Sequence, residues 1–203
     1  MVSSGARLLL GHPPTVLILA SGRGERFTAS GGQGNKLQAM LQGKTVLQHT
    51  LDAVRASGLP FHLEFAPHPG MGDAIAAAVH ATPEAAGWLI LPGDLPLIQP
   101  ATLWAVAHAL ERQAVVLPTF DGQRGHPVGF STVCRDELMG LRGNQGAAAV
   151  VRARGAMKLV VTDVGVVTDI DTLDDFNGVA QLLARKATSD GTRAWTLPSK
   201  TIL

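Results

Sequence analysis

The sequence predicts an α/β domain with a mostly parallel central sheet, and three observations indicate it. Short apolar runs alternate with helical segments of about ten residues, which is typical of parallel sheets. The first apolar run, Val16 to Ala20, leads into a glycine-rich loop, as a buried strand does before a ligand-binding turn. The length of 203 residues suits one domain with a full core.

The expected elements follow from where apolar runs, glycines and prolines fall. Strands are predicted at the short apolar runs, over residues 16–20, 61–65, 88–91, 114–117, 128–130 and 159–162. Helices are predicted where apolar residues recur at helical spacing, over residues 37–54, 73–80, 100–112, 147–154 and 173–185, and the first of these regions is expected to contain a turn at Gly43. We therefore expect one domain over residues 15–185, a loose leader over 1–14 and a C-terminal tail over 186–203. From Lys186 onward the periodicity is lost, and the tail should be extended, poorly ordered or packed on a partner through Trp195.

Composition excludes several classes of function. The 17 basic and 16 acidic side chains leave a net charge of +1, which favours neither nucleic acid nor an acidic membrane surface as a partner. No apolar run approaches the roughly 20 residues that a membrane-spanning helix needs. The single cysteine, Cys134, cannot form an internal disulfide, which suits a reducing cytoplasm. We interpret Cys134 as a packing residue rather than a nucleophile, since no base lies near it in the sequence.

The glycine-rich loop that ends at Lys36 predicts a phosphate-binding site. Glycines let backbone N–H groups approach a phosphate closely, and Arg23, Arg26 and Lys36 supply the positive charge that a triphosphate needs. The loop is not a P-loop, because Leu37 follows Lys36. Nor is it a dinucleotide-binding turn, because Phe27 stands where the third glycine is required. A flexible surface loop is the alternative, but the cations and the buried strand favour phosphate.

Acidic residues near predicted strand ends indicate a metal site. Asp94 follows the strand 88–91 directly, and ligands of parallel sheets bind at the carboxyl ends of strands. Mg²⁺ is usually held by one or two carboxylates together with phosphates; the alternative is that Asp94 caps a turn. Asp169 and Asp171 face the same side if that segment is extended. Capping of the next helix does not explain both, so one of them is expected to share the metal with Asp94.

Two glycine-containing turns are further candidates for substrate contact. The turn at 122–127 offers Arg124 and His126, and the turn at 143–146 offers two side-chain amides; the alternative for both is an ordinary turn. Of the other histidines, His62 and His68 flank a strand and a turn. No third ligand stands at a usable spacing from them, so we expect no zinc site.

Taken in order, six motifs resemble those of the nucleotidyltransferases that attach a nucleotide to molybdopterin, above all the molybdenum cofactor cytidylyltransferases. The motifs are LASGRGERF, PGMGDAI, LPGDLPLI, GQRGHPVGF, GNQGAA and DIDTLDD, and the resemblance runs from about Thr15 to about Leu183. It implies a Rossmann-like three-layer sandwich of the nucleotide-diphospho-sugar transferase type. It also implies Mg²⁺ as the cofactor, a nucleoside triphosphate as substrate and pyrophosphate as a product.

The resemblance assigns roles to individual residues. Asp94 and Asp171 are implied as Mg²⁺ ligands, with Arg26, Lys36 and Asp94 as the catalytic residues. The nucleotide is implied to contact Leu19, Ala20, Ser21, Gly22, Arg23, Gly24, Gly70, Met71, Gly72 and Asp73. The pterin side of the site is implied to contain Gly125, His126, Asn144, Gln145 and Gly146.

The function expected on this basis is transfer of CMP from CTP to the phosphate of molybdopterin in the cytoplasm, with the product passed to a molybdoenzyme. CTP is favoured because Ser21 leaves less room at the pocket floor than glycine would, and because Asp73 can accept a hydrogen bond from cytosine. The alternatives are a guanylyltransferase that uses GTP and a non-catalytic module that delivers the cofactor. A nicotinamide oxidoreductase is disfavoured, because the third glycine and a ribose-binding acidic residue are missing.

The chain departs from the resembled pattern in two places that affect structure. Phe27-Thr28 replace Met-Gly, and the stretch 29–35 separates Arg26 from Lys36, so we expect a longer, more mobile loop with Lys36 exposed. Only one predicted strand, 61–65, stands between the first helix and the PGMGDAI motif, so the sheet is expected to be smaller than in relatives.

Overall fold

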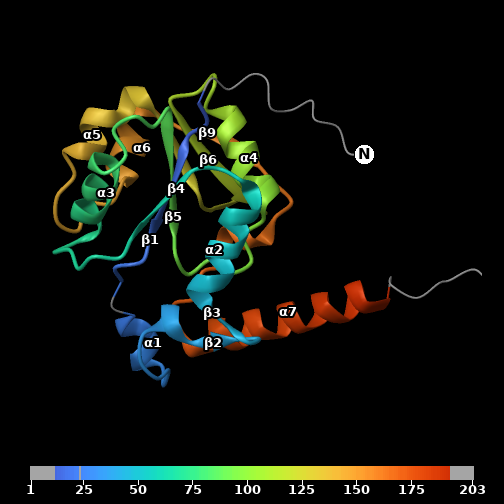
Figure 1. Cartoon of the computed structure of the whole chain (residues 1–203). Helices are drawn as coiled ribbons and strands as arrows, with labels where there is room; N and C mark the ends of the chain where they lie inside the picture. The colour runs from blue at the N-terminus through green and yellow to red at the C-terminus, as the bar shows by residue number, and fades with distance from the viewer. Residues whose placement is uncertain (1–11, 23, 193–203) are drawn as a thin grey trace, which may run out of the picture.

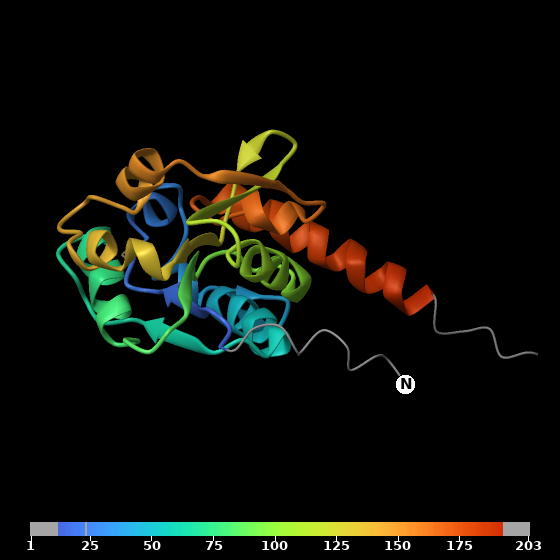
Figure 2. The same cartoon turned by 90° about the horizontal axis from the view of Figure 1, so that it is seen from above.

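The computed structural model describes residues 12–22 and 24–192, and for residues 186–192 it describes the backbone only. A central sheet is covered by helices on both faces (Figure 1). A smaller layer lies beyond one end of the sheet, and the last helix, α7 (Leu173–Thr192), extends away from the body (Figures 1 and 2). The predicted three-layer α/β architecture is thus confirmed.

The sheet has seven strands in the order β4-β1-β5-β8-β6-β7, with β9 also paired to β6. Their bounds are β1 (Thr15–Leu19), β4 (Phe61–Glu64), β5 (Gly87–Pro92), β6 (Val115–Phe120), β7 (Gln123–Arg124), β8 (Val128–Ser131) and β9 (Met157–Val160). Within this sheet β7 and β8 run antiparallel to their neighbours, and the other pairings are parallel. Because β1 and β5 pair in parallel from Thr15↔Trp88 to Leu19↔Pro92, their carboxyl ends lie side by side.

Strand β1 is buried on both faces, which explains its unbroken apolar sequence. Successive side chains of a strand point to opposite faces. Leu17 therefore packs on the side of α3 (Met71–His80), α5 (Arg135–Met139) and α6 (Ala148–Arg154). Ile18 packs on the side of α2 (Val46–Ser57) and α4 (Pro100–Ala109).

The smaller layer joins the glycine-rich loop to α7. It contains α1 (Glu25–Ala29), the 3₁₀ turn η2 (Lys36–Gln38), the hairpin β2 (Met40–Leu41) and β3 (Lys44–Thr45), and part of α7. Its own core includes Phe27 and Leu37, and Phe27 meets Phe176 edge to face at 6.1 Å between ring centroids. Ser30 accepts a hydrogen bond from the backbone N–H of Leu173 at 2.9 Å. The stretch that we expected to be mobile is thus folded against α7.

Several predicted boundaries are wrong for local reasons. The helical region predicted over 37–54 begins as α2 only at Val46. The turn predicted at Gly43 is present, since Gln42 and Gly43 adopt positive φ angles between β2 and β3, but the residues before it are not α-helical. The helix predicted over 100–112 ends at Ala109. Strand β6 continues to 120, and β9 lies two residues before its predicted place.

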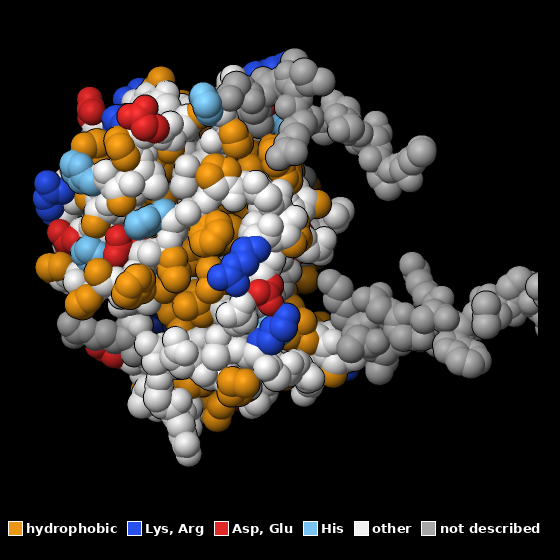
Figure 3. All heavy atoms as spheres, viewed as in Figure 1, with side chains coloured by type: hydrophobic (Ala, Val, Ile, Leu, Met, Phe, Trp, Pro, Cys, Tyr) orange, Lys and Arg blue, Asp and Glu red, His pale blue; other side chains and the backbone are white. Residues whose placement is uncertain are grey.

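Both ends of the chain bear on the expected domain limits. Helix α7 continues to Thr192, so the expected tail begins with helix rather than extended chain. Trp195 and most of the expected leader lie outside the described residues. In the part of the chain that the structure describes, no helix is long and apolar enough to cross a membrane. On the face seen in Figure 3, acidic and basic side chains are interspersed and no large patch of one sign forms.

Candidate active site

Asp94 lies in a rigid turn at the carboxyl end of β5. The preceding Gly93 donates its backbone N–H to Leu19 at 2.9 Å and accepts a hydrogen bond from the Thr50 hydroxyl at 3.0 Å. The carbonyl of Asp94 itself accepts the backbone N–H of Ile170 at 3.1 Å. Asp94 is only 8% exposed, so its carboxylate is both buried and fixed in direction.

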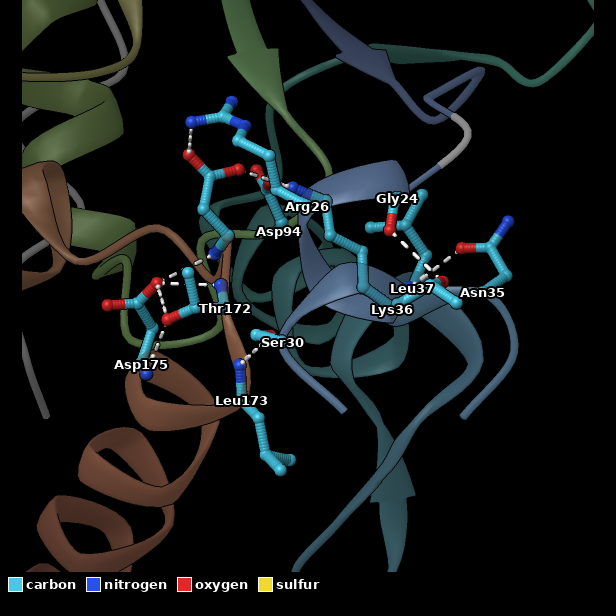
Figure 4. Close-up of polar contacts among 12 residues, drawn as sticks. Gly24, Arg26, Ser30, Asn35, Lys36, Leu37, Asp94, Thr172, Leu173 and Asp175 are labelled. Atoms are coloured by element: carbon cyan, nitrogen blue, oxygen red, sulfur yellow. Dashed lines mark hydrogen bonds and ion pairs between the residues drawn. The ribbon is translucent and has the colours of Figure 1, made fainter. Parts of the chain in front are cut away.

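Lys36 joins Asp94 to Asp171 through two ion pairs. Its Nζ lies 2.5 Å from Oδ2 of Asp94 and 2.8 Å from Oδ1 of Asp171. Arg26 extends the chain of charges, because its Nη1 lies 2.6 Å from Oδ2 of Asp171. Figure 4 shows Arg26 and Lys36 on the glycine-rich loop close to Asp94. Four of the residues predicted for catalysis and metal binding therefore meet in one place.

The position of Lys36 corrects the expectation that it is exposed. Its side chain is 12% exposed, whereas that of Arg26 is 76% exposed. Burial lowers the pKa of Lys36, but the charge of Asp94 and the hydrogen bonds to Asp171 and Asp94 outweigh it, so the pKa is raised. The ammonium is thus held in its charged form between the two carboxylates.

The carboxylates fit a divalent cation. Oδ1 of Asp94 is buried and has no hydrogen-bond partner among the described residues. An unpaired buried anionic oxygen is costly unless a cation or donor reaches it. Within the described chain, no group of three His, Cys, Asp or Glu side chains is arranged to hold a metal. Mg²⁺ is usually bound by only one or two protein carboxylates, with phosphate oxygens and water filling its remaining coordination positions, so two carboxylates are sufficient.

Asp169 lies near the same carboxylates. Partial burial, followed by the charges of Asp171 and Asp94, raises the pKa of Asp169. His126 is also near, and burial lowers its pKa while Asp169 and Asp94 only partly oppose the shift. The imidazole of His126 is therefore neutral near pH 7, and its buried Nδ1 has no hydrogen-bond partner among the described residues.

The residues predicted for the nucleotide fall into two groups. The first group follows β1, which ends at Leu19, and continues through Ala20 to Ser21 and Gly22. The backbone N–H of Ala20 donates to the carbonyl of Glu64 at 2.8 Å. The second group begins α3, where Gly72 donates its backbone N–H to Gly143 at 2.8 Å. Gly24 precedes α1 with a left-handed φ of 66°, and Arg23 lies outside the described residues.

The residues predicted for the pterin also fall in two places. The turn at 143–146 packs on the start of α3, where a Cβ on Gly72 would lie 2.5 Å from the carbonyl oxygen of Gln145. One oxygen of Asp73 accepts the backbone N–H of Gly143 at 2.8 Å, so Asp73 holds this turn. Gly125 and His126 instead contact Val166, whose carbonyl accepts the N–H of His126 at 2.8 Å.

Sequence reasoning missed Asp163, which positions the segment that carries Asp169 and Asp171. Asp163 is 4% exposed and accepts the Thr102 hydroxyl at 2.7 Å and the backbone N–H groups of Gln99 and Gly165 at 3.0 and 2.9 Å. It thereby ties the 3₁₀ turn η4 (Val164–Val167) to the start of α4. The local signal was an aspartate two residues before a glycine after a strand, a common capping pattern.

A second missed group is Glu64 at the end of β4. Glu64 is 8% exposed and lies between His62 at 3.4 Å and His68 at 3.1 Å. Burial raises the pKa of Glu64, but its close contacts with His68 and His62 and the hydrogen bond from the N–H of Ala66 outweigh burial and leave the pKa lowered. The sequence did not predict this cluster. Glu64 is the last residue of the strand that contains His62, and the turn after the strand brings His68 back to it.

Cys134 behaves as the packing residue that we expected. It is fully buried. Burial, assisted by the charge of Glu137, raises the pKa of its thiol. A buried thiol with a raised pKa is a poor nucleophile.

A pocket of about 590 Å³ lies beside Asp169 and Asp171. It is bounded on one side by Asp169 and Asp171 and on the other by the first half of α7, which contributes Asp174, Asp175 and Gly178. The sequence alone does not indicate this pocket, because its two walls are brought together only by the fold.

The sequence is similar to known proteins. Residues 52–158 match the model of the MobA-like NTP transferase domain, a range that includes Asp94. The bifunctional protein GlmU of Xanthomonas campestris is 29% identical over 147 residues, which are 61% of this chain. GlmU of Stenotrophomonas maltophilia is 30% identical over 148 residues. The matched region spans 31% of the length of these curated relatives.

Solved structures share the fold. Rv0371c of Mycobacterium tuberculosis superimposes with a TM-score of 0.72 at 24% identity, over 83% of this chain and 98% of the other. The same protein in complex with manganese gives a TM-score of 0.68, at the same identity and coverage. Molybdopterin-guanine dinucleotide biosynthesis protein A of Archaeoglobus fulgidus gives 0.61 at 16% identity, over 84% of this chain and 99% of the other. The fold is therefore of the nucleotide-diphospho-sugar transferase type.

Proposed function

The chain belongs to the family of MobA-like NTP transferase domains, and on that premise we propose that it transfers CMP from CTP to the phosphate of a molybdopterin-type acceptor, releasing pyrophosphate. The observation that carries the proposal is the pairing of Asp94 and Asp171 around Lys36, beside Arg26. Two carboxylates and two cations at the carboxyl edge of the sheet suit a metal-bound triphosphate.

Positioning and charge neutralisation account for this chemistry without a protein nucleophile. A phosphate oxygen of the acceptor attacks the α-phosphorus of the nucleotide, the bond to the bridging oxygen breaks, and pyrophosphate leaves. Mg²⁺ held by Asp94 and Asp171 would supply the neutralising charge on the phosphates. Lys36 and Arg26 would bind the triphosphate oxygens and stabilise the departing pyrophosphate.

Gly22, after β1, would leave room for the nucleotide. A Cβ added to Gly22 would meet no heavy atom within 4 Å, so the backbone after β1 is open to a ligand. Ser21 beside it would leave less room for a base than glycine would, which favours a pyrimidine over a purine. The start of α3 and the turn at 143–146 would form the wall beside the base, held together by Asp73.

The acceptor assignment is supported by the name of the Archaeoglobus fulgidus relative, a molybdopterin-guanine dinucleotide biosynthesis protein. The same name favours a second candidate, a guanylyltransferase that uses GTP with the same acceptor. The product of either reaction would serve a molybdoenzyme. The relative crystallised with manganese supports a divalent metal in this fold.

The test is incubation with each of the four nucleoside triphosphates, Mg²⁺ and molybdopterin, followed by mass measurement of the product. The proposal predicts a cytidylyl adduct and an equal amount of pyrophosphate. A guanylyl adduct would select the second candidate. Absence of pyrophosphate with every nucleotide would reject nucleotidyl transfer to this acceptor and leave a delivery module as the explanation.

A further inference from the structure

Two unpaired polar atoms lie at the candidate active site. Within the described chain, the buried side-chain atoms without a hydrogen-bond partner are Oδ1 of Asp94, Nδ1 of His126 and Nε2 of His68. The His68 nitrogen lies 3.1 Å from the carboxylate of Glu64, which can pair with it as an ion. An unpaired buried polar atom costs free energy unless a donor or a cation reaches it. The other two atoms therefore point to a ligand that reaches both.

The backbone brings His126 to the same edge of the sheet as Asp94. Strands β5 and β8 pair antiparallel, so the chain that enters β8 lies beside the chain that leaves β5. His126 is on the first of these segments and Asp94 is on the second. One further segment binds both, because Val166 accepts the N–H of His126 at 2.8 Å and Ile170 donates its N–H to the carbonyl of Asp94 at 3.1 Å. The fold thus holds the two residues close together.

The two unpaired atoms fit a hydrated divalent cation. Oδ2 of Asp94 pairs with Lys36 at 2.5 Å, which leaves Oδ1 for a cation. Burial lowers the pKa of His126, and the charges of Asp169 and Asp94 only partly oppose this shift, so the imidazole is neutral near pH 7 and does not repel a cation. A neutral imidazole has one nitrogen that accepts a hydrogen bond. A hydrated cation satisfies both residues, because the carboxylate binds the ion and the imidazole accepts an O–H of its water.

A water molecule between the cation and His126 fits the structure better than a direct bond. No three His, Cys, Asp or Glu side chains in the described part of the chain are arranged to hold a metal, so His126 does not complete a ligand set with the carboxylates. Mg²⁺ loses water reluctantly and usually keeps several bound water molecules. Groups that hydrogen-bond to the ligands of a metal orient them, and their loss typically costs about 10–100-fold in metal affinity.

We propose that His126 is a positioning residue of the metal site, and that its Nδ1 accepts a hydrogen bond from water retained by a divalent cation on Asp94. The inference rests on the proposed function only for the presence of that cation. It assigns His126 to the metal rather than to the pterin side of the site, where the motif resemblance placed it. It also requires a cation that keeps bound water, as Mg²⁺ does.

The test measures metal binding separately from catalysis. The probe is Mn²⁺ alone, which shares the preference of Mg²⁺ for oxygen ligands; it is titrated into the full-length protein, and the free ion is followed by EPR. His126→Leu removes the acceptor and should raise the Kd for Mn²⁺ about tenfold or more. His126→Asn offers a side-chain oxygen near the position of Nδ1 and should recover most of the affinity.

The matched control is His68→Leu. It also removes an imidazole with an unpaired buried nitrogen, but His68 follows β4, and β1 lies between β4 and β5 in the sheet. This change should leave the Kd for Mn²⁺ unaltered. Thermal unfolding with chelator and with Mn²⁺ checks the fold. Because Nδ1 is unpaired in the metal-free protein, His126→Leu should not lower the unfolding temperature with chelator, but it should remove most of the increase that Mn²⁺ produces.

The outcomes separate this inference from the proposed function. Mn²⁺ binding that His126→Leu weakens, His126→Asn restores and His68→Leu preserves supports the role of His126, even if no pyrophosphate is released with any nucleotide. If the wild type releases pyrophosphate and His126→Leu binds Mn²⁺ as tightly as the wild type, the role of His126 is refuted while the function stands. Equal weakening in His126→Leu and His126→Asn, failure of the wild type to bind Mn²⁺, or a direct bond from Mn²⁺ to nitrogen in pulsed EPR also overturns it.

Discussion

Replacing Lys36 with methionine should destabilise the metal-free protein substantially and increase its response to divalent cations. Methionine keeps much of the side-chain volume but removes the charge that joins two carboxylates. The Nζ contacts are 2.5 Å to Asp94 and 2.8 Å to Asp171, and these side chains are 11% and 22% exposed. Removing one partner of a buried pair costs roughly 3–5 kcal/mol. Because Asp171 retains Arg26 and is partly solvated, we expect about 3 kcal/mol.

The assay is urea unfolding at neutral pH, with chelator and then with excess Mn²⁺. Mn²⁺ should stabilise Lys36→Met more than the wild type, because the ammonium no longer competes for the carboxylates. Lys44→Met is the matched control. Its Nζ lies 2.6 Å from Asp52, but the two side chains are 54% and 36% exposed. Because this pair is exposed to solvent, we expect that change to leave the midpoint of urea unfolding nearly unchanged.

The pH dependence supplies an independent check. The pKa of Lys36 is raised in the folded protein, so its contribution to stability is fully present below the ordinary lysine pKa. The contribution is lost as the pH rises through the raised value. The difference between wild type and Lys36→Met should therefore be constant near neutral pH and shrink in strong alkali. Equal losses in Lys36→Met and Lys44→Met, or equal stabilisation of wild type and Lys36→Met by Mn²⁺, would refute the bridging role.

Three further predictions follow from other contacts. Asp163→Ala leaves three donors unpaired and should lower the free energy of unfolding by about 2–4 kcal/mol; a change below about 0.5 kcal/mol in urea unfolding would contradict its anchoring role. Gly72→Ala should cost about 1–3 kcal/mol and raise the KM for CTP, because its Cβ would lie 2.5 Å from the Gln145 carbonyl oxygen. Gly178→Ala is the control, because a Cβ there would meet no heavy atom within 4 Å, and it should not lower the free energy of unfolding. If both changes altered the free energy of unfolding equally, a close contact at Gly72 would be contradicted. The ratio of kcat/KM for CTP over GTP with one acceptor should be about tenfold, and a ratio at or below unity would reject the role of Ser21.

The sheet and the meeting of Asp94 with Asp171 could be predicted from the sequence. The strands follow from local apolar runs, and the site follows from the rule that ligands bind at the carboxyl ends of parallel strands. Buried parallel strands have continuous apolar sequences, so β1 and β5 stand out in the chain. The carboxyl ends of parallel neighbours meet at one edge, which brings the residues after β1 close to Asp94. The same rule predicted that Asp171 or Asp169 would join them.

The contacts that the sequence did not predict are those between segments far apart in the chain. Lys36 and Asp171 are separated by 135 positions, and nothing near Lys36 in the sequence indicates that a carboxylate will bury it. Asp163 likewise accepts a hydrogen bond from Thr102, which lies 61 positions away in the sequence. Gly70 and Gly72 were expected to contact the nucleotide, whereas backbone atoms of residues 142–145 lie where their Cβ atoms would be.

The segment 29–35 illustrates how local composition can mislead. Its glycines predicted mobility, but Gly32 leaves room for the ring of Phe27, which a Cβ would approach to 2.3 Å. Phe27 and Ser30 then attach the loop to α7. Glycine here serves close packing, and the distinction is visible only when the neighbour is known.

Nucleotidyl transfer at Asp94 is tested most directly by the rate of pyrophosphate release from CTP, with molybdopterin and saturating Mg²⁺, in wild type and Asp94→Asn. Asparagine keeps the shape of the side chain and an oxygen that can accept a hydrogen bond from Lys36, so the fold should survive, which circular dichroism checks. We expect steady release by the wild type and a loss of about a hundredfold or more in the variant. Release at the wild-type rate by Asp94→Asn would show that the carboxylate pair is not the catalytic centre.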